Sequence, residues 1–482
     1  MAVTQIVQAP LYSTLVAGQE IIFAVSNDPA LADYTRVKFV VDVHISEGAP
    51  PVISTGTNKI GTFKVTPNNS GIGMIDLSGV IESYVSADNL AANGSSFKGA
   101  ATTDTQNHPM HLIDKYSFSK NSARYMALKF SVEGLLPATN VIGNIVGTGV
   151  SSPTTYLITN AYLKYTDKLE NRTTLAPDNW FGYNMNKFFP TAGSATKQFL
   201  TNAPDIQYAN GDDYGTVAFL VRDFTQGQAA RKLILKYYDS ADNLLGSENI
   251  VRSITNGSSY WGSNQGIDNT KNQLQYVGCF PGNLRNWSSV FKTKYDLGQM
   301  DAGKITVSLG SDGGGTVSTQ TYTIKLNCPN QKDYESIRLC WMNQWGAWDY
   351  YSFNQKSIRN ISTKGTTYQQ LQGNWSSPYY NANGYKGGKK AFRKNAVESI
   401  KINTDFVNED YNIIFEELTN SPEVYILKGY EETSINIDTL NRFVTPVTLK
   451  TSSFTKKTIA NDKLIQYTFE IEKSKILRTQ SI

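Results

Sequence analysis

Short apolar runs separated by turn-forming residues are the feature that most constrains the fold of this chain. Ile21–Val25, Val37–Val43 and Ile60–Val65 alternate or run apolar, and clusters rich in Asn, Gly or Pro bound them. Runs of this kind indicate strands. Charged residues make up only 18% of the chain, which does not suit a fold dominated by long helices. The sequence therefore predicts a mainly β fold, all-β to α+β, with several antiparallel sandwich-like or barrel-like domains, long loops and few short helices.

Other elements follow from the same signals. The pattern predicts a hairpin in Lys232–Leu245 with its turn at Asp239–Asn243, a helix in Asp76–Val85, and one helical turn at Phe415–Leu418 ended by Pro422. Further predicted strands include Arg338–Trp341, Ala161–Tyr165, Thr216–Arg222, Gly303–Leu309, Thr321–Leu326, Glu398–Asn403, Tyr411–Phe415, Val424–Leu427, Ser434–Ile437 and Leu464–Ile471.

The length of 482 residues is enough for about three domains. We expect an N-terminal β-rich domain with a long loop at 1–120, one or more central β-rich domains at 121–332, and a β-rich or α+β domain at 333–482. Ser86–Asp114 and Asn374–Gly388 are low in apolar residues, so both are predicted to be long loops that become ordered against a neighbouring subunit.

The segment Arg338–Phe353 holds three of the seven tryptophans, Trp341, Trp345 and Trp348, within eight residues. Its pattern predicts a strand, a turn at Asn343–Gly346 and a second strand, so the tryptophans lie at a hairpin-like corner. Large aromatic side chains at such a corner anchor a core or a subunit contact more often than they form a ligand platform. Asp349 is predicted to fix the corner by hydrogen bonds.

A resemblance rests on this corner and on three other segments. Trp341-Met-Asn-Gln-Trp-Gly-Ala-Trp-Asp349, with Phe353 beyond it, is similar to a pattern of virion structural proteins of tailed phages that infect Bacteroidetes, including the crAss-like phages. Phe63–Tyr84 resembles the N-terminal part of such proteins, and Leu418–Tyr425 with Leu464–Ile471 resembles their C-terminal part. The middle third of the chain has no match to the pattern.

The resemblance implies a ring or hub component of the phage tail or neck, which forms a symmetric oligomer around the DNA channel. Its implied partners are copies of itself and other tail or neck proteins, with non-specific proximity to genomic DNA. The implied location is the virion, after assembly in the host cytoplasm. The sequence contains no run of about 18 apolar residues, so no membrane insertion is expected.

One basic cluster stands out in an otherwise balanced chain of 45 basic and 41 acidic residues. It contains Lys386, Lys389, Lys390, Arg393 and Lys394, with glycines between them and an aromatic residue on each side. Three interpretations stay open: a solvated loop, a contact with a neighbouring subunit, or phosphate contacts to DNA in a channel.

The sequence nominates no catalytic, cofactor or metal site. His108 and His111 have Asp104 and Asp114 nearby, but Pro109 interrupts the spacing of a metal site. The three cysteines, Cys279, Cys328 and Cys340, form no paired motif, and we expect buried thiols. No nucleophile, zincin or dinucleotide motif is present. We therefore expect a protein that is not an enzyme and has no cofactor.

Two other functions remain as alternatives. A receptor-binding or carbohydrate-binding module of a tail fibre or baseplate would use aromatic loops around Trp261, Trp287 and Trp375. A polysaccharide-cleaving enzyme would need a pair of carboxylates that the sequence does not reveal.

Overall fold

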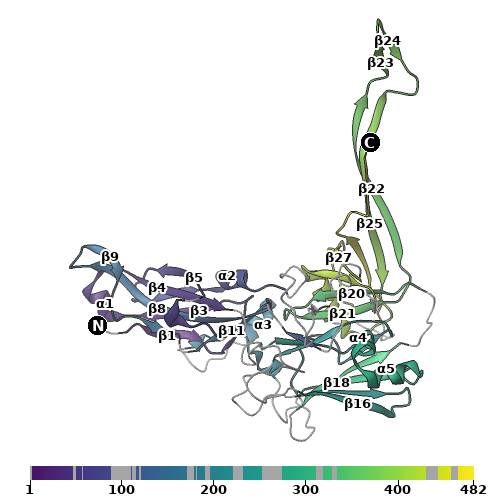
Figure 1. Ribbon diagram of the computed structural model, residues 1–482. Coiled ribbons are helices and arrows are strands. Elements are labelled where there is room, and N and C mark those ends of the chain that lie inside the picture. The colour runs from purple at the N-terminus through teal and green to yellow at the C-terminus, as the bar shows by residue number, and fades with distance from the viewer. Residues whose placement is uncertain are drawn as a thin grey trace. The chain divides into compact units, whose positions relative to one another are not determined.

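Strands are the main element of the protein, as the computed structural model shows (Figure 1). The structure describes residues 3–46, 50–56, 58–87, 110, 116–118, 121–152, 154–170, 179–180, 182–189, 196–220, 232–251, 274–310, 319–327, 334–429, 443–457 and 465–481. These residues belong to two compact units. Unit 1 takes those within 1–329 and 342–349, and unit 2 takes those within 330–341, 350–434 and 438–482.

The first part of unit 1 is a β-sandwich. One sheet has the order β12-β1-β3-β6, and the other has the order β2-β11-β8-β4-β5 with β9 and β10 also paired to β8. The first sheet contains β1 (Gln5–Pro10), β3 (Ile22–Ser26), β6 (Gly73–Asp76) and β12 (Asn179–Trp180). The second contains β2 (Thr14–Val16), β4 (Thr35–Ser46), β5 (Lys59–Val65), β8 (Ala123–Leu136), β9 (Val141–Asn144), β10 (Val150–Ser151) and β11 (Tyr156–Thr159).

Aromatic side chains join these two sheets. The ring of Phe23 on β3 lies 5.6 Å from that of Phe130 on β8 and 5.7 Å from that of Tyr156 on β11, between ring centroids. All three side chains are fully buried. The residues that face inward from both sheets therefore form one core between the two sheets.

The rest of unit 1 contains two further sheets. A five-stranded sheet has the order β13-β19-β18-β15-β16, and a three-stranded sheet has the order β14-β17-β7. Their strands are β7 (Tyr116–Phe118), β13 (Ile206–Ala209), β14 (Thr216–Leu220), β15 (Lys232–Tyr238), β16 (Leu244–Val251), β17 (Leu274–Gly278), β18 (Lys304–Gly310) and β19 (Tyr322–Leu326). The helical elements of unit 1 are α1 (Asp28–Asp33), η1 (Ile53–Thr55), α2 (Ser78–Ile81), η2 (Glu82–Tyr84), α3 (Tyr165–Glu170), η3 (Met185–Phe188), α4 (Pro281–Trp287) and α5 (Ser289–Asp296).

An eight-stranded antiparallel sheet organises unit 2. Its order is β21-β20-β26-β27-β28-β25-β22, and β29 pairs with β25 as well. The strands are β20 (Ile337–Met342), β21 (Trp348–Phe353), β22 (Ile358–Gln370), β25 (Gly388–Asn403), β26 (Val424–Leu427), β27 (Val444–Leu449), β28 (Thr468–Lys473) and β29 (Arg478–Ser481), and β23 (Gly373–Ser376) and β24 (Tyr379–Ala382) form a separate pair.

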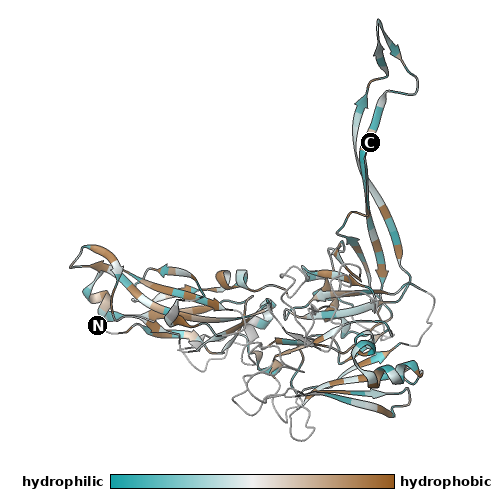
Figure 2. Ribbon diagram, in the orientation of Figure 1, coloured by the Kyte–Doolittle hydropathy of each residue, from teal (hydrophilic) through white to brown (hydrophobic). Residues whose placement is uncertain are grey.

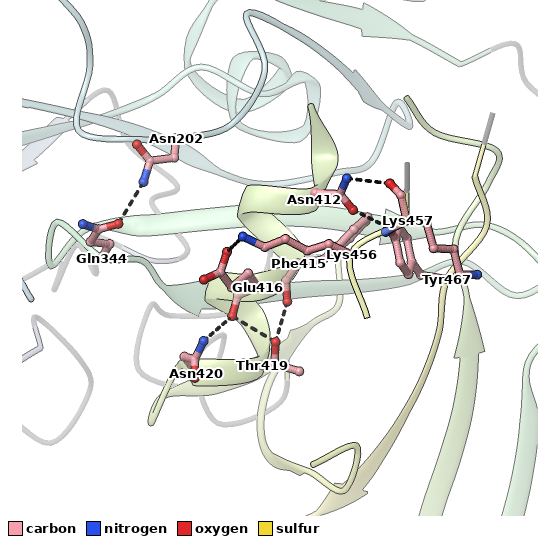
Figure 3. A network of polar contacts seen from close by, with 10 residues as sticks. All are labelled: Asn202, Gln344, Asn412, Phe415, Glu416, Thr419, Asn420, Lys456, Lys457 and Tyr467. Carbon is pink, nitrogen blue, oxygen red and sulfur yellow. Dashed lines mark hydrogen bonds and ion pairs between the residues drawn. The ribbon is translucent and has the colours of Figure 1, made fainter. Parts of the chain in front are cut away.

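One helix, α6 (Tyr411–Asn420), packs in unit 2 through an aromatic cluster. Phe415 lies within 5.5 Å of the rings of Tyr351, Tyr467 and Phe469, between centroids. Polar contacts hold the outer side of the helix: Lys456 pairs with Glu416 at 2.6 Å, and Asn412 donates to the carbonyl of Lys457 (Figure 3). The helix is therefore fixed on both sides to the C-terminal part of the chain.

The mainly β architecture with few short helices is confirmed, and the described sheets include no closed barrel. The predicted hairpin is also present as β15 and β16, because the Asp239 carboxylate accepts from the backbone N–H groups of Ala241 and Asn243 and so forms the turn. The predicted helix in Asp76–Val85 is two short pieces, α2 and η2. The division into 1–120, 121–332 and 333–482 stays a prediction, because compact units alone do not define domain boundaries.

Two predicted strands are wrong. Tyr411–Phe415 is the start of α6, where Tyr411, Ile414, Phe415 and Leu418 recur at helical spacing and are buried. Ala161–Tyr165 is irregular until α3 begins, and its backbone bonds to loops instead of a strand: the Ala161 carbonyl accepts from Gly18 N–H. The predicted strand Ser434–Ile437 and most of the predicted loop Ser86–Asp114 lie outside the described residues.

We predict that Trp341→Ala lowers the free energy of unfolding by about 3 to 5 kcal/mol, because this fully buried ring would leave a cavity in the interior. Trp375→Ala is the matched control, since that ring is 72% exposed and should leave the stability unchanged. Thermal and chemical denaturation followed by circular dichroism measures both. Equal stability of the two variants would contradict a core role for Trp341.

Candidate functional site: a tryptophan corner and a basic arm

Asn343 builds the turn of the tryptophan corner. Its side-chain oxygen accepts from the backbone N–H groups of Trp345 at 3.0 Å and Ala347 at 3.1 Å, and its amide donates to the carbonyl of Leu200 at 2.9 Å. Gly346 has φ +75°, and a Cβ there would lie 2.2 Å from the carbonyl oxygen of Asn160. The turn therefore needs both the short amide side chain and the glycine.

Trp345 fills the interior of unit 1. Its ring centroid lies 4.6 Å from that of Phe188 and 5.5 Å from that of Tyr183, and its Nε1–H donates to the side chain of Asn202 at 3.1 Å. The Nζ of Lys187 lies 4.8 Å from the centroid of the same indole. Burial lowers the pKa of Lys187, whereas the charge of Asp167 raises it. The indole is therefore packed inside unit 1 and is only 3% exposed.

The other residues of the corner are buried as well. Trp341, Trp348 and Asp349 all lie in the interior. Thr201 Oγ1 donates to Asp349 Oδ1 at 2.5 Å, so the carboxylate joins two segments that are 148 residues apart in the chain. The structure thus places all four corner residues inside the protomer.

The surface of unit 2 carries a feature that the sequence did not predict, a long arm of two strands to which β29 adds a third beside Arg393–Ala396. We define the arm as residues 360–397, which comprise most of β22, the β23–β24 hairpin and the first part of β25 (Figure 1). β22 and β25 pair from Ile358↔Lys401 to Gln370↔Gly388, with a shift in register between Thr366 and Thr367 that leaves Phe392 without a paired residue. The 13 residues of β22 span roughly 40 Å at the usual rise of a strand.

Both faces of the arm are open to solvent. No residue of β22 is buried, and in β25 burial begins at Glu398. Figure 2 shows hydrophilic colours along much of the arm. A two-stranded ribbon with no covered face is marginally stable in water. Such an element gains stability when a partner covers it.

The end of the arm is aromatic and uncharged. We call residues 371–385 the tip, and this segment contains no Asp, Glu, Lys or Arg. Trp375 is 72% exposed, Tyr379 71% and Tyr385 77%. Asn374–Gly388 was predicted to be a loop, but it contains most of the β23–β24 hairpin and leads directly into β25, so that prediction is wrong.

The basic cluster also lies on the arm. A solvated loop was one of its three interpretations, but only Lys386 lies in a turn, and Lys389, Lys390, Arg393 and Lys394 are on β25. Gly387 (φ +94°) and Gly388 (φ +76°) take left-handed backbone conformations where the hairpin leads into β25, and the strand is continuous from there. Among the described residues, none of the five basic side chains has an ion pair with a carboxylate.

The base of the arm differs from its outer part because its charges are paired. Glu398 accepts from Arg359 on β22 and Lys473 on β28, each at 2.6 Å, and Arg359 also binds Glu335. The hydrogen bond from Lys473 lowers the pKa of Glu398, partial burial opposes this shift, and Arg359 adds to it. This network fixes the arm to the sheet of unit 2.

The remaining candidate residues form no site in the described part of the chain. Trp287 is half-buried and donates to the carbonyl of Gly278, and Cys279 and Cys340 are buried free thiols. Burial raises the pKa of Cys340 well above its ordinary value. The described residues contain no cluster of His, Cys, Asp or Glu suited to a metal and no helix long and apolar enough to cross a membrane. Trp261, His108, His111 and Cys328 lie outside the described residues.

Comparisons with known proteins give distant similarities. No family model matches the chain, and no curated protein matches it. One similar solved structure is that of Rst D1-D2, with 10% identity and a TM-score of 0.19, covering 68% of this chain and all of that one. Another is native alpha-2-macroglobulin from Escherichia coli spanning domains MG0-NIE-MG1, with 6% identity and a TM-score of 0.21, covering 82% of this chain and 93% of that one. Neither score establishes a shared fold.

We predict that Glu398→Gln destabilises the protein by about 1 to 3 kcal/mol at pH 7, because two charged donors lose an ionised acceptor. The pKa of Glu398 is lowered by folding, so its contribution is present above the ordinary value of 4.5 and is lost as the pH falls through the lowered pKa. The stability difference between the two proteins should therefore shrink in acid. Denaturation between pH 3 and pH 7 measures it, and a difference independent of pH would contradict this assignment.

Proposed function

We propose that this protein is a structural subunit of a tailed-phage particle, a ring or hub component of the tail or neck that assembles into a symmetric oligomer around the DNA channel. The observation that carries the proposal is the arm, whose aromatic tip has no cover within the described part of the protomer. The resemblance of the tryptophan corner to virion proteins of Bacteroidetes phages is the reason for proposing that the assembly is a phage particle.

The tip has the composition of a protein contact. Aromatic residues are enriched at the centres of protein interfaces, where charged residues are depleted. The tip carries Trp375, Tyr379, Tyr380 and Tyr385 and has no charged residue, although charged residues are 18% of the whole chain. We infer that each tip binds the next copy of the chain, so that repetition around a ring combines many modest contacts.

The proposed partners are therefore copies of this chain and other tail or neck proteins, and the proposed location is the virion. The role is mechanical, without a cofactor or a catalytic step. The buried tryptophan corner serves this role indirectly, because it fixes the inside of the protomer while the arm reaches outward.

A receptor-binding or carbohydrate-binding module is the second candidate, favoured by the exposure of Trp375 beside Tyr379 and Tyr380. Aromatic faces of this kind also stack on sugar rings. The two functions differ in copy number and position: a ring has a fixed symmetric copy number on the tail axis, whereas a fibre or baseplate module is peripheral.

We predict that the triple variant Trp375→Ser, Tyr379→Ser and Tyr380→Ser keeps its fold but forms smaller or weaker oligomers than the wild type, because the tip loses its apolar contact area. Sedimentation velocity and negative-stain electron microscopy of the purified proteins measure mass and symmetry. A matched control replaces three exposed apolar residues of unit 1 by serine: Val146, Tyr165 and Leu297. Assembly of the tip variant into the same rings as the wild type, or a wild type that stays monomeric at all concentrations, would contradict the proposal.

A further inference from the structure

The charge of the arm is of one sign. Residues 360–397 contain six basic residues and no acidic residue, whereas the remainder of the chain has 39 basic and 41 acidic residues, obtained by subtracting the arm from the totals of 45 and 41. Protein surfaces usually mix both signs. A segment with charges of one sign attracts a partner of the opposite sign.

The positive charges occupy both faces of the ribbon. Thr366 pairs with Arg393 and Tyr368 with Lys390, so these two basic residues share one face with Lys364. Gly365 pairs with Lys394 and Gln369 with Lys389, which puts these two on the other face, because successive residues of a strand alternate. Anions on both sides of the ribbon would therefore meet a cation.

Protection of a free strand edge does not account for this pattern. Edge strands are commonly blocked by charged residues, above all lysine. β22 is the terminal strand of its sheet, and no described strand pairs with its outer edge, but its basic residues are only Arg359 and Lys364. Arg393 and Lys394 lie where β25 is paired on both sides, with β22 and with β29. Their charges therefore lie on the faces of the arm and do not protect a strand edge.

From this geometry we propose that the two-stranded outer part of the arm, which carries Lys386, Lys389 and Lys390, inserts into the major groove of double-stranded DNA. Lys364, Arg393 and Lys394, where β29 adds a third strand, contact the flanking phosphates, and none of the contacts made by these residues, the basic part of the arm, reads sequence. The major groove of B-form DNA is about 12 Å wide and admits a two-stranded β-ribbon, with a phosphate backbone on each side. The deep, narrow major groove of A-form RNA does not admit it. The uncharged tip lies beyond this part of the arm.

This inference goes beyond the proposed assembly and is separable from it, since the basic part and the tip can be altered independently. A contact between the basic part and an acidic surface of another copy is the competing outcome of the test. The relevant variant replaces five basic residues by glutamine: Lys386, Lys389, Lys390, Arg393 and Lys394. Three of these side chains are exposed and two are half-buried, so the fold should persist.

The experiment measures binding of the full chain to a fluorescein-labelled duplex of about 30 base pairs by anisotropy, between 50 and 200 mM salt. Five phosphate contacts give a slope of about −4.5 in log affinity against log salt, so the wild type should lose about 500-fold over this range. The five-glutamine variant should lose this slope and bind at least about 100-fold more weakly at 50 mM salt.

Two controls separate charge from fold. One replaces five basic residues elsewhere by glutamine and should bind like the wild type: Lys38, Lys129, Lys236, Lys292 and Lys401. The other replaces Lys386, Lys389, Lys390 and Lys394 by arginine, which keeps the charge and should keep the binding.

Three outcomes would overturn the proposal. Equal affinity and slope for the five-glutamine variant and the wild type would place DNA binding elsewhere or nowhere. Loss of oligomers in that variant, without DNA binding by the wild type, would assign the basic part to a neighbouring subunit. Tighter binding to duplex RNA or to single-stranded DNA of the same length would exclude the major groove. Loss of assembly in the tip variant with intact DNA binding leaves this inference standing, and the reverse result leaves the proposed function standing.

Discussion

The hydrogen bonds between β22 and β25 are the interaction on which the arm depends. Sheets elsewhere in the chain are stabilised by buried faces, such as the one that carries Phe23, Phe130 and Tyr156. The arm has no such face, so its extended shape depends on backbone pairing and on the charges at its base. The Glu398 network is placed where the ribbon leaves the sheet. Its two cations come from β22 and β28, and so it holds the arm to strands that do have a buried face.

The tryptophan corner shows why aromatic residues alone do not locate a functional surface. Trp345 and Trp375 are the same residue type, yet one packs on Phe188 and Tyr183 and the other points into solvent. The difference comes from the surrounding residues. Asn343 and Gly346 fold the first back into unit 1, whereas Trp375 lies on a short hairpin with no layer above it. A cluster of tryptophans therefore indicates stability here, and the more dispersed aromatic residues of the tip mark the accessible surface.

Local signals in the sequence predicted most of the strands, because apolar alternation and turn residues act over a few positions. Asp239 defines its hairpin turn in this way. Two elements were not predicted from the sequence: the start of α6 and the arm. Tyr411–Phe415 has β-rich composition, and its helical spacing becomes clear only when Leu418 is included and when the cluster of Tyr351, Tyr467 and Phe469 is known. The arm escaped because both its faces are polar, so its strands lack the apolar alternation that indicates burial. The absence of acidic residues from 350 to 397 was the available signal for the site.

The return of the chain to unit 1 at residues 342–349 has a consequence for how the protomer is completed. Unit 1 is not finished when the ribosome reaches residue 329, because the indole that Tyr183 and Phe188 pack against is still to be made. Until then, Tyr183 and Phe188 lack the ring against which they pack. The segment around Trp345 is thus synthesised late. In the sequence it lies between two strands that belong mainly to unit 2. Completion of the one unit is coupled through the chain to synthesis of the other, which delays a fully closed protomer until the sequence that leads into the arm is being made.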